Sequence, residues 1–314
     1  MTVRPRSILG RRAPEAHSDP ARTVERLAAL LGAGVPASTC WRLLSEDTPD
    51  DPVLRAAADA AARGEPVADA ISDSLPRLPS SERAAWSATA AGVAVASQAG
   101  APLSDALRVV SERLASVAET GRETEIALAG PRMTTRLVLA LPVLGILGSS
   151  LLGFDAWAAL IGTPYGRIVG AAGVLLLILG ALWSRALTRR AHPSAAAPGF
   201  SLELLAIAVR GGGALDAARR TVRRECDRHA VPIDEEAIDG CLRLAGRAGA
   251  PVSGLLRAEA ALLRSVGAAD DRRRAAALGV TLLLPLGACV LPAFMLLAVV
   301  PSIIAVATST LSGF

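Results

Sequence analysis

Side chains that could bind a metal ion cluster at Cys226-x-x-His229, with Cys241 twelve residues further along the chain. A structural zinc site normally has four Cys or His ligands at paired short spacings, and here the fourth ligand is missing. His229 falls near the predicted end of a helix, where a cation is favourable without any metal. We therefore predict no metal and no other cofactor for this chain.

Residues that handle phosphate or perform covalent catalysis are also missing. All 33 basic residues are Arg, whereas a P-loop and a Schiff-base enzyme each use a Lys. The run Arg210-Gly211-Gly212-Gly213 is not followed by Gly-Lys-Ser/Thr, so we interpret it as a glycine-rich helix end. The three His residues have no supporting motif for a Ser/His/Asp triad. The sequence predicts a protein that is not an enzyme.

Two groups of acidic residues remain as candidates for protein interaction, because exposed carboxylates steer association with a basic surface. The first acidic group surrounds a predicted hairpin at about 52–75 and comprises Glu46, Asp47, Asp50, Glu65 and Asp69. Asp51 is left out of it, because it precedes Pro52 and fits a helix cap.

The second acidic group comprises Asp234, Glu235, Glu236 and Asp239. It is typical of the first turn of a helix, with Asp234 as the cap. The alternative is a contact with a partner or a cation.

These residues belong to a chain that is too apolar for an ordinary soluble domain, with 52% hydrophobic residues and a mean hydropathy of +0.42. Uncharged runs occupy 137–154, 168–184 and 275–314. At 1.5 Å per residue the first two runs give helices about 27 and about 26 Å long, enough to cross a membrane. Buried helices of a soluble protein are the alternative. Two passes in the third run would need a turn, and no charged or strongly polar turn interrupts this run. We therefore predict one pass near 284–307.

Arginine residues flank all three runs and predict their orientation by the positive-inside rule. We expect the chain in the cell membrane (inner or plasma membrane). The arginines place the N-terminus and the region 185–274 in the cytoplasm, and the short loop and the C-terminus on the external side. The net charge of +4 is too mild to suggest a nucleic-acid partner. The flanking residues, which we expect at lipid head groups, are Arg132, Arg136, Arg185, Arg189, Arg190, Arg272, Arg273 and Arg274.

Outside the apolar runs, the predicted elements are helices, and the fold class is an all-α membrane protein. Two cytoplasmic antiparallel helix bundles and three transmembrane helices are expected. The predicted parts are a disordered basic tail (1–19), a first bundle (20–130), a transmembrane helix (134–155), an external loop (156–166), a second transmembrane helix (167–185), a linker (186–198), a second, shorter bundle (199–274), and a stem with the third transmembrane helix (275–310).

The two bundles carry an internal repeat. Residues 99–108 (AGAPLSDALR) and 248–257 (AGAPVSGLLR) are identical at seven of ten positions, at an offset of 149. In both copies a glycine ends one helix and a proline opens the next, at Gly100 and Pro102 and at Gly249 and Pro251. About forty residues later, Leu-Pro recurs at 141–142 and at 291–292. Each copy is therefore predicted to be a bundle whose last helix leads into the membrane.

This layout resembles the F-type inner-membrane platform proteins of type II secretion and type IV pilus machines. The residues that carry the resemblance are the Gly-x-Pro elements at 34–36, 100–102 and 249–251 and the ending 291–301 (LPAFMLLAVVP). The resemblance covers roughly 20–310. The short second bundle and the lack of Lys point to the Flp-type (tight-adherence) pilus branch.

The resemblance implies a non-enzymatic scaffold that couples a cytoplasmic hexameric secretion ATPase to pilin or pseudopilin assembly or to protein export. It also implies an oligomer of this chain or of a related F-type subunit in the membrane. The alternative is a small transporter or channel component, but no ionisable residue lies inside the three runs. A membrane-bound signalling protein is a third possibility, without a kinase or phosphoacceptor motif to support it.

Overall fold

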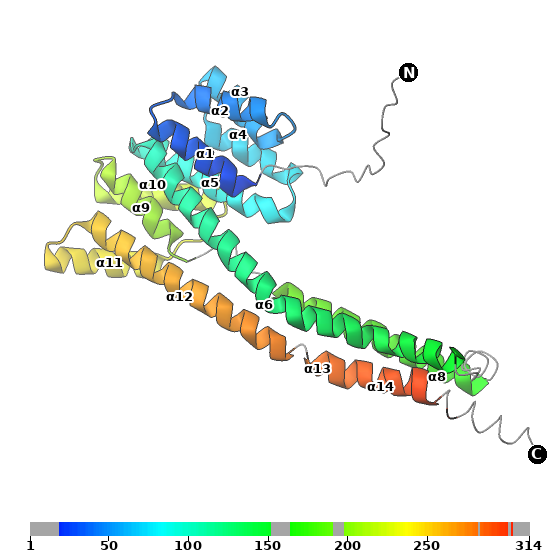
Figure 1. Ribbon diagram of the computed structural model, residues 1–314. Coiled ribbons are helices and arrows are strands. Elements are labelled where there is room, and N and C mark those ends of the chain that lie inside the picture. The colour runs from blue at the N-terminus through cyan, green and yellow to red at the C-terminus, as the bar shows by residue number, and fades with distance from the viewer. Residues whose placement is uncertain (1–18, 152–163, 191–197, 282, 301–302, 304–314) are drawn as a thin grey trace, which may run out of the picture. The chain divides into compact units, whose positions relative to one another are not determined.

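The computed structural model describes residues 19–151, 164–190, 198–281, 283–300 and 303 (Figure 1). The chain divides into two compact units. Unit 1 consists of Met1–Ala118 and Ser194–Gly267, and unit 2 of Glu119–Pro193 and Ala268–Phe314. All regular elements in the described residues are helices, which confirms the all-α fold class.

Unit 1 is built from two sets of helices that are far apart in the sequence. The first set is α1 (Pro20–Gly32), α2 (Ala37–Asp47), α3 (Pro52–Arg63), α4 (Val67–Ser74), the 3-10 turn η1 (Leu75–Arg77), α5 (Ser80–Ala99) and the start of α6 (Leu103–Leu151). The second set is α9 (Phe200–Arg210), α10 (Leu215–Arg228), α11 (Glu235–Ala248) and most of α12 (Val252–Thr281).

The start of α3 shows why these helices begin where the sequence predicts. The carboxylate of Asp51 accepts hydrogen bonds from the backbone N–H groups of Val53 (2.8 Å) and Leu54 (3.3 Å), and Pro52 occupies the first helical position. A cap of this kind stabilises a helix by about 1 kcal/mol. Asp19 caps α1 in the same way through the N–H of Ala21.

The repeated hinge adopts the same backbone geometry in both copies. Gly100 and Gly249 are left-handed, with φ of +66° and +61°. The N–H of the next residue then bonds back to the fifth carbonyl before it, from Ala101 to Ala96 (3.0 Å) and from Ala250 to Ala245 (3.3 Å). Glycine suits these positions because an L side chain is strained at positive φ.

One hydrophobic core in unit 1 includes residues from both predicted bundles. The α5 helix contacts α1 and α4 from the first set and α9 and α10 from the second. It is buried on all sides near its C-terminal end, and every residue of α9 from Phe200 to Ala208 is buried. Helices that are apolar all round need cover on every face. The two segments therefore pack together rather than forming two separate bundles.

Unit 2 contains the rest of α6, then α8 (Pro164–Arg190), the end of α12, and the segments that follow it. Those segments are α13 (Leu283–Pro285), the π-helical turn η2 (Leu286–Val290), α14 (Leu291–Phe294) and the π-helical turn η3 (Met295–Val299). Together 283–300 form one helical run. Its π-helical turns lie on either side of Pro292, in keeping with the way proline disturbs helical hydrogen bonding.

Within unit 2, α8 contacts η2, α14 and η3. A Cβ atom on Gly173 would lie 2.5 Å from Cγ of Leu297, and one on Gly180 would lie 3.1 Å from Cβ of Cys289. Glycine at these two positions permits close approach of the helices, as is common between membrane helices.

Among the described residues, one helical stretch, Gly166–Leu187, is long and apolar enough to cross a membrane. It contains the second predicted run, 168–184. The first and third predicted runs extend beyond the described residues, at 152–154 and at 304–314. The predicted basic tail and external loop also fall outside them, apart from their last residues.

Candidate functional site

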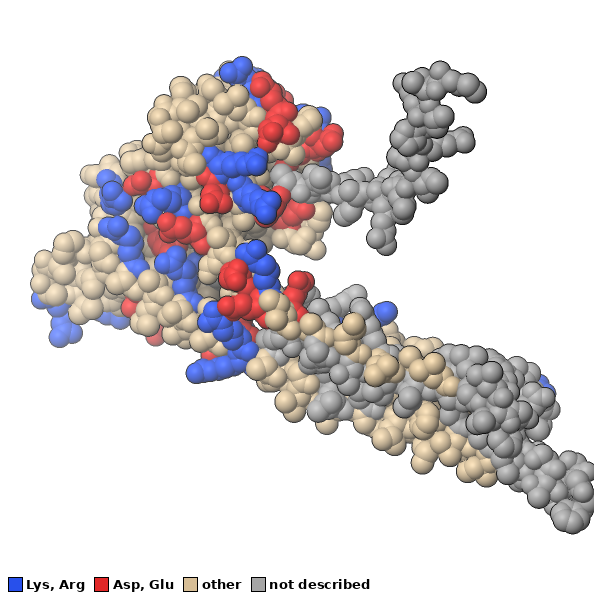
Figure 2. All heavy atoms as spheres, viewed as in Figure 1, with Lys and Arg blue, Asp and Glu red and all other residues tan. Residues whose placement is uncertain are grey.

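The first acidic group lies on α2, in the turn after it, and around the start of α4. Four of its members pair with arginine: Glu46 with Arg42 (3.9 Å), Asp47 with Arg26 (2.9 Å), Glu65 with Arg63 (2.8 Å) and Asp69 with Arg228 (3.0 Å). Asp50 lies exposed in the turn between α2 and α3. Figure 2 accordingly shows acidic and basic side chains interleaved on this part of the surface.

The arginine partners change what the first acidic group can do. The hydrogen bond from Arg63 lowers the pKa of the Glu65 carboxyl group, so this group stays ionised. Exposed pairs of this kind add little to stability, about 0–1 kcal/mol each. A basic partner that binds these carboxylates would therefore have to displace the arginines of the chain itself.

A pocket of about 540 Å³ lies beside Glu65 and Asp69. Its walls come from α2, the turn between α3 and α4, α5 and α10, so both sets of helices of unit 1 contribute. Trp41, Glu225 and Arg228 also line it. Glu65 and Asp69 thus lie beside α10, a helix of the second set, at this pocket.

His229 lies at the C-terminal end of α10, and its side chain is fully buried. Burial lowers the pKa of this imidazole, with the charge of Glu225 acting in the opposite direction. The sequence-based interpretation of a favourable cation at a helix end is therefore wrong, because desolvation disfavours the charged ring. The described residues contain no group of three or more Cys, His, Asp or Glu side chains that could hold a metal ion.

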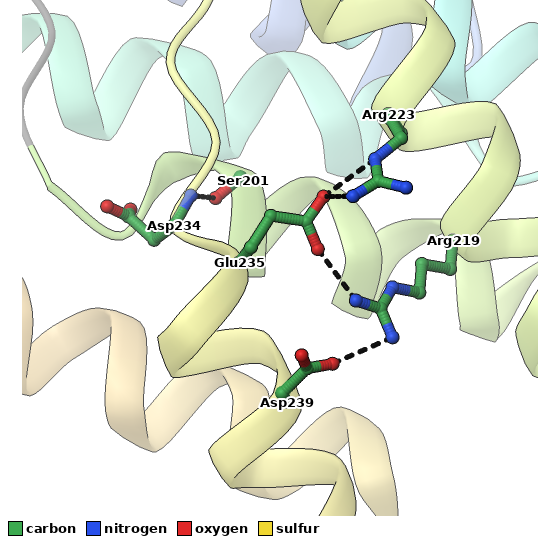
Figure 3. A network of polar contacts seen from close by, with 6 residues as sticks. All are labelled: Ser201, Arg219, Arg223, Asp234, Glu235 and Asp239. Atoms are coloured by element: carbon green, nitrogen blue, oxygen red, sulfur yellow. Dashed lines mark hydrogen bonds and ion pairs between the residues drawn. The ribbon is translucent and has the colours of Figure 1, made fainter.

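The second acidic group is a structural network between α10 and α11 (Figure 3). Glu235 accepts from Arg219 (2.7 Å) and Arg223 (2.6 Å), and Arg219 also reaches Asp239 at 2.7 Å. Glu236 is exposed. The ion pairs lower the pKa of Glu235, with the hydrogen bond from Arg219 as the largest cause.

Asp234 precedes α11, as expected, but its carboxylate does not cap that helix. It accepts a hydrogen bond of 2.7 Å from the backbone N–H of Gly199, ahead of α9. Its own backbone N–H donates to Oγ of Ser201 at 3.0 Å, as Figure 3 shows. Asp234 therefore fixes the start of α9 beside the start of α11.

Two buried charged residues, Arg113 and Glu203, were not predicted from the sequence, and Glu203 pairs with the half-buried Arg264. Arg113 lies 3% exposed on α6, with its guanidinium 5.1 Å from the ring centroid of Phe200. Glu203 on α9 is 5% exposed and accepts from Arg264 on α12 at 2.7 Å. Desolvation lowers the pKa of Arg113 to about 10 and raises that of Glu203. The available signal was an ionisable residue at a core position of α6 and of α9.

Each flanking arginine of the third cluster pairs with an acidic residue in unit 2. Arg272 bonds Glu123 at 2.6 Å, Arg273 bonds Asp270 at 3.2 Å and Arg274 bonds Asp271 at 3.3 Å. Arg185 is exposed on α8. The side chains of Arg132, Arg136, Arg189 and Arg190 lie outside the described part of the chain.

The described structure defines an all-α protein with a helical core unit and a second unit that carries the long apolar helix α8. Residues 23–148 match the family described as type II secretion system (T2SS), protein F. The predicted resemblance to F-type proteins of the secretion machinery is thus confirmed over this part of the chain, from α1 into the second half of α6. No curated protein and no solved structure matches the chain.

Proposed function

We propose that this chain is a multi-pass inner-membrane platform subunit of a pilus-assembly or type II secretion-like machine, and that it is not an enzyme. The observation that carries the proposal is the T2SS protein F match at 23–148, which spans most of the first segment of unit 1. The hinge geometry shared by Gly100 and Gly249 supports extending this assignment to the second segment, which the match does not reach.

In this role the chain couples a cytoplasmic hexameric ATPase to the assembly of a pilin or pseudopilin. It works as a homo-oligomer or as a hetero-oligomer with a related F-type subunit. The first acidic group is the proposed ATPase-docking surface, with the second acidic group as the alternative. The pocket beside Glu65 and Asp69 favours the first group, because it offers a recess next to carboxylates that can change partners.

Co-purification from cells tests the proposal. The intact chain, isolated in mild detergent, should recover a secretion ATPase, and the chain alone should not hydrolyse ATP. Reversal of Glu46, Asp47, Glu65 and Asp69 to Arg should reduce that recovery while membrane insertion is retained. Recovery that stays equal at low and physiological salt would move docking to the second acidic group.

A matched variant separates docking from folding. Asp216→Arg changes an acidic residue in the first turn of α10, outside both acidic groups, and should leave ATPase recovery unchanged. The transporter alternative predicts solute uptake that depends on the chain and no ATPase recovery from native cells. Either result would contradict the platform role.

A further inference from the structure

A groove of about 930 Å³ runs between α11 and α12 in unit 1. Apolar side chains line it, including Leu244 and Leu262, which are 53% and 54% exposed. Val266, one turn beyond Leu262 on α12, is 50% exposed. Among the large hydrophobic side chains that the structure shows exposed in unit 1, Leu43 on α2 is the one outside α11 and α12. The apolar exposure of this unit is thus concentrated at the groove.

The internal repeat shows that this exposure is specific to the second copy. At the offset of 149, the hairpin of α11 and α12 corresponds to the hairpin of α5 and the start of α6. On one side the two hairpins are buried at equivalent positions, such as Leu107 and Leu256 (both 0% exposed). On the other side they differ. Val95 is 0% exposed, whereas its counterpart Leu244 is 53% exposed.

In the first copy, α9 packs against the hairpin formed by α5 and the start of α6. Ile207 packs against Ala96 and Ala106, and Arg210 at the end of α9 pairs with Asp105 at 3.0 Å. Ala106 is the counterpart of Leu255, which lines the groove of the second copy, so an apolar helix covers this position in the first copy. The residues of α9 from Phe200 to Ala208 are already buried, so this helix has no free face for the groove.

The groove between α11 and α12 has the charge for an occupant of similar chemistry. Its lining contains Asp234, Glu235, Glu236 and Glu259 but one basic residue, Arg243. Arg219 and Arg223 offset part of this charge through Glu235 and Asp239. Even with these partners included, carboxylates outnumber guanidinium groups by five to three.

We propose that this groove binds an amphipathic helix of a partner protein, whose apolar ridge enters between Leu244 and Leu262 and whose flanks carry Arg or Lys. Helix-in-groove recognition uses apolar anchors at helical spacing, and complementary charge selects the partner. The proposal stands on the groove itself and does not depend on the secretion role.

An environment-sensitive fluorophore at the groove tests the proposal. Leu262→Cys is labelled with bimane in the full chain, reconstituted in zwitterionic nanodiscs. The four natural cysteines are all buried, which directs the label to the new site. The probes are two model helical peptides with the same leucine ridge, one flanked by Arg and the other by Glu. Empty nanodiscs give the lipid background, and Leu43→Cys is the matched control at an exposed leucine.

We expect a saturable blue shift at position 262 with the Arg-flanked peptide and none at position 43. Leu244→Ser should weaken this binding by about tenfold, whereas Leu43→Ser should not change it. Equal binding of both peptides, equal shifts at the two positions, or no shift at 262 would overturn the proposal. A shift at 262 that needs no peptide and grows with the number of chains per nanodisc would instead assign the groove to a second copy.

Discussion

The hydroxyl group of Ser72 lies 2.7 Å from Nδ1 of His229, although 157 residues separate the two in sequence. This contact joins α4 to the end of α10. On the other side of the ring, Nε2 faces Oε2 of Glu225 at 3.6 Å. A neutral ring that carries its proton on Nε2 accepts from Ser72 and directs its N–H towards the carboxylate, which is the tautomer these contacts favour.

Acid should destabilise unit 1 through this histidine. Burial lowers the pKa of His229 from its ordinary 6.5, so the unfolded chain binds a proton more readily than the folded one. Stability is therefore lost as pH falls below about 6.5. Thermal unfolding in detergent at pH 7.5 and 5.5 should show a smaller loss for His229→Gln than for the native chain. Equal losses would contradict this assignment.

Loss of Glu203 should destabilise the fold more than loss of a surface acid. Glu203→Leu breaks the ion pair with Arg264 and removes the nearby negative charge that offsets the burial of Arg113, at a cost of about 3 kcal/mol. Adding Arg113→Met should recover much of that loss, because the unpaired buried charge is removed. Denaturant unfolding of the two single variants and the double variant gives the coupling. Strictly additive effects would show that the two groups act independently.

Substitution of the repeated hinge glycine should cost stability through backbone strain. Gly249→Ala places a side chain at φ +61° with open space around it, so the loss of about 1 kcal/mol comes from the backbone alone. Gly240→Ala, inside α11 and also in open space, is the control and should stabilise by about 0.5–1 kcal/mol. The same sign for both changes would contradict the hinge argument.

The arginine flanks predict how the chain crosses the membrane. Alkaline phosphatase fused after residue 160 or after residue 314 should be active, because this reporter works outside the cytoplasm. A fusion after residue 240 should be inactive. An inactive fusion at 314 with an active one at 160 would mean that the third apolar run makes two passes.

Helix type and helix ends in unit 1 followed from local signals in the sequence. Asp51-Pro52 and the two Gly-x-Pro hinges act within a few residues, so their effect can be predicted without knowledge of the tertiary structure. The joint core was not predictable in this way, because α5 and α9 are apolar on all sides and show no preferred face. The roles of Asp234, Glu203 and His229 likewise depend on residues from other helices. Asp47, Asp69 and Glu235 pair with arginines of other helices, which the spacing of the acidic residues does not show.

The shared core of unit 1 also sets an order of events during synthesis. Cover for α5 comes from α9 and α10, and α10 ends at Arg228, more than a hundred residues after Ala118. At about 5–20 residues per second, the ribosome reaches that point roughly 5–20 s later. The apolar helix α8 emerges in between. Synthesis of α8 thus precedes completion of the core, and until then α5 has only the cover of α1 and α4.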